Sequence, residues 1–371
     1  MRILYGVVGE GMGHATRSRV ILEELVKEHE VQVVASGRAH AYLAERFPDV
    51  HRIWGFTLHY EGNAIRRIPT VFRNLRGAVG GWPRNVGAYF KLVASFRPDV
   101  VVSDFESFSY YFGKAHGIPV IDLDNIHVIS KCRHSPELLR GHEHDFGLIR
   151  SVVAAKLPRC FHYVIPTFFY PPVRTRRTTL VPPVLRPEIL AARSERGQHL
   201  LVYQTATTNR ALPETLKRLG MPARVYGLRR DLTEDVVDGS VTYRPFGEAR
   251  FIEDLRTARA VVAGGGFTLL SEAVYLHKPV LSVPVERQFE QVLTALYLQE
   301  LGYGTHAHRL DQASLGAFLA RIPERESALA AYRQDGNAVA LATVKEQLGL
   351  VAARRARRSR RRRDDTPWRS A

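Results

Sequence analysis

Residues 3–18 read ILYGVVGEGMGHATRS, and this stretch decides the class of fold. The apolar run Ile3–Val8 predicts a buried strand that ends at a glycine-rich loop. Residues 16–28 follow with apolar side chains at helical spacing, and residues 31–35 are apolar again. A strand, a loop, a helix and a second strand make a β-α-β unit, so we predict a parallel sheet covered by helices.

The same alternation of short apolar runs and amphipathic segments occurs twice along the chain. It breaks where six prolines gather between residues 166 and 187, and it restarts at residue 199. A chain of 371 residues is also long enough for two hydrophobic cores. We predict an α/β protein with two facing Rossmann-like domains and a cleft between them. The predicted domains are residues 1–167 and 198–348, joined by a linker at residues 168–197, with the last helix allowed to pack back on the first domain.

The composition is that of a globular protein in a reducing compartment. Hydrophobic residues make up 45% and charged residues 24% of the chain, and its two cysteines form no disulfide framework or zinc spacing. The first residues resemble a strand rather than a signal peptide, and no apolar run reaches the roughly 18 residues that cross a bilayer. We expect a cytoplasmic protein, with a peripheral position at the inner face of the membrane as the alternative.

The net charge of +16 is concentrated at the C-terminus. Residues 354–371 carry nine arginines and two aspartates, a net charge of +7, and the rest of the chain carries +9. We predict that residues 349–371 form a basic, disordered tail. This tail is either a solvated charge run or a contact with an anionic membrane surface, and nucleic acid is the less favoured partner because no recognition module accompanies it.

The glycine loop ends at His14, which is the candidate catalytic base. The spacing approaches the dinucleotide fingerprint, but His14 stands at the position of the third glycine, and no acidic residue closes the second strand. The ends of parallel strands are where open α/β sheets bind ligands, and imidazole is suited to removing a proton near neutral pH. We therefore predict that His14 is a general base.

A carboxylate that holds the second imidazole nitrogen would support this base. Asp104 and Glu106 follow the apolar strand Val100–Ser103 and are expected at the same sheet edge. We assign Asp104 to the catalytic pair and Glu106 to the acceptor side. The alternative for both residues is capping of the helix that begins at residue 107.

A second glycine loop predicts the binding site for a sugar donor. Gly264, Gly265 and Gly266 lie between an apolar strand and a helix, where free amides and the positive helix end bind phosphate. The P-loop lysine is missing, which favours a diphosphate leaving group over triphosphate chemistry. Further donor candidates lie at strand ends or in the first turns of helices: Thr205, Thr207, Arg244, Phe246, Phe267, Thr268, Glu272, Glu290 and Gln291.

These motifs resemble the GT-B glycosyltransferases, especially the peptidoglycan N-acetylglucosaminyl transferase branch and the plant-type UDP-sugar transferases. The resemblance extends over about residues 1–348 and is most specific at GMGHATRS (11–18) and GGGFTLLSE (264–272). SDFE (103–106) and DLDNIH (122–127) also resemble a bacterial and archaeal group with the GMGH loop.

The resemblance implies an inverting, metal-independent glycosyltransferase of the hexosyltransferase type, with a nucleotide sugar as co-substrate, UDP-sugar favoured, and no cofactor. It also implies that Glu272 contacts the ribose and that Glu290 and Gln291 contact the donor sugar. Plant-type members have a phosphate-binding histidine where this chain has Gly264, so phosphate binding would rest on amides and threonines. The implied acceptor side comprises Gly11, Met12, Gly13, Glu106, Asn125 and His127.

Several alternatives remain open. Asp122 and Asp124 match the DxD of metal-dependent transferases of another fold, although we favour no metal because they end a strand. The basic, aromatic segment at residues 54–90 is either a membrane-resting site for a lipid-linked acceptor or a loop over a small or glycosidic acceptor. The competing functions are a nucleotide-sugar 2-epimerase and a non-catalytic protein that binds nucleotide sugar or lipid.

Overall fold

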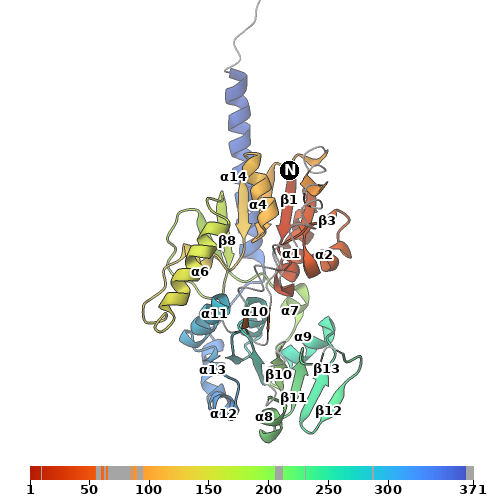
Figure 1. Cartoon of the computed structure of the whole chain (residues 1–371), viewed down its shortest axis with the longest axis vertical. Helices are drawn as coiled ribbons and strands as arrows, with labels where there is room; N and C mark the ends of the chain where they lie inside the picture. The colour runs from red at the N-terminus through yellow and green to blue at the C-terminus, as the bar shows by residue number, and fades with distance from the viewer. Residues whose placement is uncertain are drawn as a thin grey trace, which may run out of the picture.

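The computed structural model describes residues 1–9, 11–55, 60–61, 64–65, 85, 87–89, 95–204, 212–229, 231–285 and 288–364. Two α/β units lie one above the other (Figure 1), and each is built on a seven-stranded sheet. This arrangement confirms the predicted fold class. Most of the predicted segment at residues 54–90 lies outside the described residues. The described part comprises residues 54–55, 85 and 87–89 and the short antiparallel pair β4 (Tyr60–Glu61) and β5 (Ala64–Ile65).

The first sheet is entirely parallel and has the order β3-β2-β1-β6-β7-β8-β9. Its strands are β1 (Arg2–Val7), β2 (Glu30–Ala35), β3 (Val50–Arg52), β6 (Val100–Asp104), β7 (Val120–Leu123), β8 (His162–Pro166) and β9 (Thr178–Val181). The helices of this unit are α1 (Met12–Leu25), α2 (Gly37–Ala44), α4 (Ser107–Ala115), α5 (Val128–Lys131) and α6 (Glu143–Lys156). All residues of β6 and β7 are buried, as expected of parallel strands covered on both faces.

The second sheet has the order β12-β13-β11-β10-β14-β15-β16, and only the edge strand β12 is antiparallel to its neighbour. Its strands are β10 (Leu200–Tyr203), β11 (Ala223–Tyr226), β12 (Val236–Asp238), β13 (Val241–Arg244), β14 (Ala260–Ala263), β15 (Val280–Ser282) and β16 (Gly304–His306). Its helices are α8 (Leu212–Arg218), α9 (Glu248–Arg256), α10 (Phe267–Tyr275), α11 (Phe289–Glu300), α12 (Gln312–Ala320) and α13 (Ile322–Leu329).

Aromatic side chains join the two units. Phe168, which follows β8, stacks on Phe267 of α10 with ring centroids 6.0 Å apart. Phe169 stacks on Tyr297 of α11 at 4.1 Å. These rings belong to one buried cluster that extends through both units, so apolar packing stabilises their mutual position.

The connection between the units differs from the predicted linker. Thr178–Val181 pairs with β8 as the last strand of the first sheet, although it lies within residues 168–197. The chain then crosses to the second unit through the short helix α7 (Pro187–Ala191). The cluster of prolines overlaps this crossing segment, but prolines also flank an edge strand, which the sequence pattern did not reveal.

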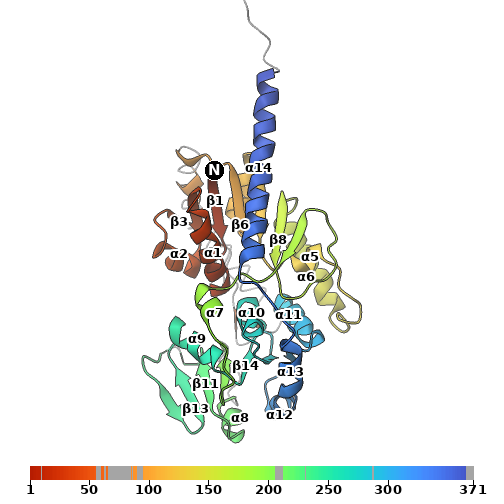
Figure 2. The ribbon, with the colours of Figure 1, turned by 180° about the vertical axis from the view of Figure 1, so that it is seen from behind.

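The C-terminal segment differs from the predicted helix at about residues 324–348 and from the predicted disordered tail. Helix α13 ends at Leu329, and a separate helix α14 (Ala338–Asp364) begins after Gly336, which has a φ of 51°. Ala340, Val344, Leu348 and Val351 pack on the core of the first unit. The basic residues that follow continue the same helix, because arginine favours helical structure. This part of α14 projects beyond the first unit (Figure 2).

The returning chain is hydrogen-bonded to the first crossing segment. The side chain of Asn337 donates to the carbonyl of Leu185 at 2.8 Å and accepts from the amide of Leu185 at 2.9 Å. Gln334 Nε2 donates to the carbonyl of Pro183 at 2.7 Å. The two segments that connect the units are therefore fastened to each other.

Candidate active site

His14 and Asp104 lie together at the carboxyl edge of the first sheet. His14 is in the first turn of α1, directly after β1, and Asp104 is the last residue of the neighbouring strand β6. The distance from His14 Nδ1 to Asp104 Oδ1 is 2.7 Å. A donor proton on Nδ1 would leave Nε2 as the basic atom, and 21% of the side chain is exposed. The structure therefore brings the predicted base and carboxylate together.

Arg17 is part of this site, and its role was not predicted from the sequence. It lies one helical turn after His14, is 4% exposed, and its guanidinium forms an ion pair with Asp104. Its Nη2 also lies 2.9 Å from Asp124 Oδ1, and its Nη1 donates to Asn125 Oδ1 at 3.1 Å. The i, i+3 spacing from His14 is a signal that places both side chains on one helix face.

The charges around His14 favour a strong base. Burial lowers the pKa of its imidazole, but Asp104 and Asp124 raise it by more, so the pKa lies above its ordinary value of 6.5. Burial raises the pKa of Asp104, whereas Arg17 and His14 lower it by more, so this carboxyl is held ionised. The pair can therefore accept a proton on the imidazole and stabilise the resulting cation.

The same cluster includes a set of groups near enough to bind a cation. One ligand atom each from His14, Asp104 and Asp124 lies within 4.8 Å of the others. Arg17 contacts both carboxylates and already supplies a positive charge there. Asp122, the first aspartate of the DxD match, is fully buried, and burial raises the pKa of its carboxyl well above the ordinary range. The residues present therefore fit a guanidinium better than a metal ion, and absence of a metal remains a prediction.

The second glycine loop is closed on one side by Gln291. The amides of Gly265 and Val285 both donate to Gln291 Oε1 at 3.0 Å. A Cβ atom on Gly265 would lie 2.4 Å from atoms of Gln291, so this position requires glycine. Gln291 thus braces the loop, and a contact between Gln291 and a sugar remains a prediction.

The first turn of α1 lies close to the first turn of α10. A Cβ atom on Gly13 would lie 2.3 Å from Thr268 Oγ1 and 3.2 Å from Thr268 Cβ, at the start of α10. Asn125 Nδ2 also donates to Glu290 Oε1 at 2.9 Å. These contacts place the base on one side of the junction between the units, and the first turns of α10 and α11 on the other.

We expect Gly13→Ala to lower the rate of the sugar transfer predicted from the sequence by about tenfold to a hundredfold. The added methyl group collides with the stiff Thr268 side chain, and a displacement of about 1 Å between reacting groups costs up to roughly a hundredfold. Steady-state kcat/KM measures the effect. Gly349→Ala is the control, because a Cβ at Gly349 meets nothing within 4 Å. Wild-type turnover by Gly13→Ala would show that the two first turns need not approach this closely.

Glu272, the predicted ribose ligand, forms a buried ion pair. It is 1% exposed, and its two oxygens accept from Arg186 Nε at 2.7 Å and Nη2 at 2.8 Å. Arg186 precedes α7 in the crossing segment and also donates to Glu248 at 2.9 Å. A contact between Glu272 and ribose would therefore require this arginine to move. The sequence did not indicate the pair, since 86 residues separate its members.

Other predicted residues have different surroundings. Glu106 caps α4 by accepting from the amides of Phe108 at 2.7 Å and Ser109 at 2.6 Å, which is the capping alternative. His127 is fully buried, and burial together with Lys131 and Lys156 lowers the pKa of its imidazole to about 3. Both residues lie inside the fold rather than at an open acceptor surface.

At the second sheet, Phe246 is 65% exposed just beyond β13, as a residue that stacks on a base would be. The Arg244 side chain turns instead toward Asp254, with Nε 3.1 Å from Oδ2. Thr205 and Thr207 lie outside the described residues. Gly11 and Met12 are partly exposed at the start of α1, beside His14.

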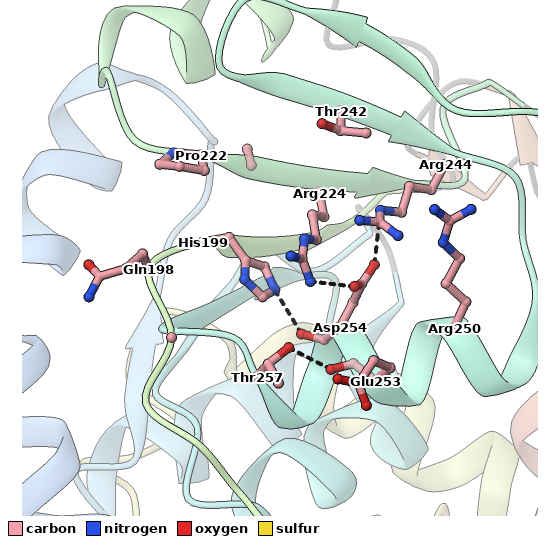
Figure 3. Close-up of a pocket in the computed structure, with 12 residues that line it drawn as sticks. Gln198, His199, Pro222, Arg224, Thr242, Arg244, Arg250, Glu253, Asp254 and Thr257 are labelled. Carbon is pink, nitrogen blue, oxygen red and sulfur yellow. Dashed lines mark hydrogen bonds and ion pairs between the residues drawn. The ribbon is translucent and has the colours of Figure 1, made fainter.

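A polar cavity of about 710 Å³ lies in the second unit (Figure 3). Arg224, Arg244 and Arg250 extend toward it from β11, β13 and α9. The buried Asp254 accepts from Arg224 at 2.5 Å and from Tyr226 Oη at 2.5 Å, and Arg250 pairs with Asp235 at 2.6 Å. These arginines therefore have carboxylate partners, and the lining includes no residue of the two glycine loops.

Comparisons with known proteins agree with this arrangement. A protein of Methanosarcina mazei described as an uncharacterized glycosyltransferase is 25% identical over 340 residues, covering 82% of this chain and 85% of its own. The glycotransferase of kitacinnamycin has a similar structure, with a TM-score of 0.66, 17% identity, and coverage of 93% and 98% of the two chains.

Phytolacca americana UGT2, solved with UDP-2fluoro-glucose and pterostilbene, has a TM-score of 0.62 at 10% identity and coverage of 95% and 98%. Among the described residues, no helix has both the length and the apolar character that a bilayer crossing requires.

The model of the family described as glycosyl transferase family 1 matches residues 1–323. The fold, the paired glycine loops and this match lead to one conclusion: the chain belongs to glycosyl transferase family 1.

Proposed function

We propose that the protein transfers a hexose from a nucleotide diphosphate sugar, with UDP-sugar favoured, to an acceptor hydroxyl with inversion of configuration. The observation that carries this proposal is the approach of the His14–Asp104 pair to the start of α10 across the junction of the units. A base and an anion-binding helix terminus are the two groups that such a transfer needs on opposite sides of the sugar.

In the proposed reaction, His14 Nε2 removes the proton of the acceptor hydroxyl. The acceptor oxygen forms a bond to the anomeric carbon on the face opposite the nucleotide, while the bond from that carbon to the diphosphate oxygen breaks. Asp104 stabilises the imidazolium, and the amides at the start of α10 together with the helix dipole of α10 stabilise the departing diphosphate. No step requires a metal ion.

The donor is proposed to bind the second unit, with its base against Phe246 and its sugar near Glu290 and Gln291. The exposed ring of Phe246 supports the first contact. The position of Glu290 at the junction supports the second, since it bonds to Asn125 of the first unit. The similar Phytolacca protein was solved with a UDP-sugar analogue, which supports a nucleotide sugar as the donor class here. The acceptor would approach from the first unit, past Gly11 and Met12.

A panel of nucleotide sugars tests the proposal by thermal shift. A ligand that binds only the folded state increases the free energy of unfolding by about 2.7 kcal/mol when its concentration is a hundred times Kd. This stabilisation raises the unfolding temperature. We expect a UDP-sugar to give the largest rise, and UDP alone a smaller one. No rise with any nucleotide sugar would refute the donor proposal. Turnover of the donor without an acceptor would indicate a 2-epimerase instead.

We also propose that the basic end of α14 binds an anionic membrane surface, which would bring the enzyme to a lipid-linked acceptor. The helix projects beyond the first unit (Figure 2). Before it does so, Arg354 contacts the ring of Phe161 and Arg355 forms an ion pair with Asp99. We expect co-sedimentation with phosphatidylglycerol-containing vesicles but not with phosphatidylcholine alone, since each basic residue contributes about 1 kcal/mol near such a surface.

The matched variant keeps Arg354 and Arg355 and changes the arginines at 357, 358 and 360–363 to glutamine. It should lose vesicle binding and keep its unfolding temperature. Equal binding by both proteins would refute the membrane proposal, and so would a preference of the wild type for RNA over vesicles.

A further inference from the structure

A chain of buried and partly buried polar contacts connects the catalytic pair to the second unit. It begins at Asp104, continues through the guanidinium of Arg17 to Asn125 Oδ1, and ends where Asn125 Nδ2 donates to Glu290 Oε1. The last two contacts measure 3.1 and 2.9 Å. Asp104, Arg17 and Asn125 belong to the first unit, whereas Glu290 begins α11 of the second.

Arg17 fixes the direction of each group in this chain. A guanidinium has donors only, so the Asn125 atom facing Arg17 must be the amide oxygen, and the amide NH₂ is then directed at Glu290. The same guanidinium contacts both Asp104 and Asp124. It also lies beside His14 Nδ1, 3.1 Å from Nη2, so the Nδ1 proton is directed to the closer carboxylate.

The charge of Arg17 also bears on the strength of the base. The charged groups that face His14 are Asp104 from β6, Asp124 after β7, Arg17 from its own helix, and Glu290 from α11. Without Arg17, the imidazole would face these carboxylates with no cation to oppose them. It would then hold its proton more tightly and return it to a leaving group or solvent less readily.

We propose that Arg17 is a positioning residue for the base and that Asn125 connects Arg17 to Glu290 of the second unit. This inference rests on the proposed function, in which His14 is the base. It adds Arg17 to the reaction, and it gives Asn125, which the resemblance placed on the acceptor side, a positioning role.

An NMR titration of the His14 imidazole tests the inference without any turnover. The His14 signal is identified by its loss in His14→Gln, since the chain contains 15 histidines. We expect Arg17→Ala to raise the measured pKa of His14 by about one unit or more, as removal of a nearby opposing charge does. Arg17→Lys should give a smaller rise, and exposed Arg38→Ala, on α2, should give none. An unchanged His14 titration in Arg17→Ala would overturn the inference.

Kinetics then separate this role from a purely structural one. The acidic limb of the pH profile of kcat/KM should move upward in Arg17→Ala by the shift found by NMR, and added guanidinium ion should restore part of the rate. Asn125→Ala should lower kcat at least about fivefold at a temperature where the variant is folded. A uniform loss of rate without a shift or rescue would contradict the positioning role. If His14→Ala keeps full activity, the proposed function fails, whereas the NMR result still decides the role of Arg17.

Discussion

His14→Ala is expected to reduce transfer at least about a hundredfold while donor affinity is retained. A general base contributes about a hundredfold to ten-thousandfold, and the contact residues of the donor lie on the other unit. Steady-state kinetics with the donor found by thermal shift give the change in kcat, and the shift itself reports on donor binding.

His142→Ala is the matched control, because this partly exposed histidine contacts Phe289 rather than the catalytic pair. Its kcat should equal that of the wild type. Retained turnover by His14→Ala would remove the proposed mechanism, and a loss of donor binding in that variant would show that the residue serves the donor instead.

Arg186→Ala is expected to lower the free energy of unfolding by about 3–5 kcal/mol. The substitution leaves the Glu272 carboxylate buried without its bidentate partner, and this is the cost typical of a broken buried ion pair. Urea unfolding followed by far-ultraviolet circular dichroism measures the loss. Arg196→Ala is the control, since its partner Glu326 is reached at the surface and such pairs contribute about 1 kcal/mol or less.

The loss in Arg186→Ala should also depend on pH. Burial raises the pKa of Glu272, and Arg186 opposes that rise, so the variant carboxyl should bind its proton still more tightly. A pKa raised in the folded state makes stability fall as pH rises from the unfolded value toward the folded one. The variant should therefore lose less stability at pH 5 than at pH 8. An equal loss at both values would show that Glu272 is not a buried carboxylate in the variant.

The architecture was accessible from the sequence because hydrophobic periodicity is a local signal. Parallel strands also share a carboxyl edge, so the strand ends at His14 and Asp104 were expected to meet, and they lie 2.7 Å apart. Sequence reasoning left two local roles open for Glu106, an acceptor contact and a helix cap. In the structure Glu106 caps α4, and Phe105, between Asp104 and Glu106, has a φ of 52°.

Residues whose role comes from distant partners were not predictable. Arg17 was visible in the glycine motif, but its contacts with Asp124 and Asn125 span more than 100 residues. The pair of Arg186 and Glu272 was not predictable for the same reason. Arg186 lies in the crossing segment and Glu272 in the second unit, so the sequence pattern of neither region indicates the contact. The helical arginine tail was missed because composition indicated disorder, whereas the packed residues before it stabilise the first turns.

The paired crossing segments have a mechanical consequence. The chain passes between the units twice, and Asn337 and Gln334 fasten the two passages to each other at Leu185 and Pro183. Because the two passages are joined by three hydrogen bonds, neither passage can be displaced alone without breaking them.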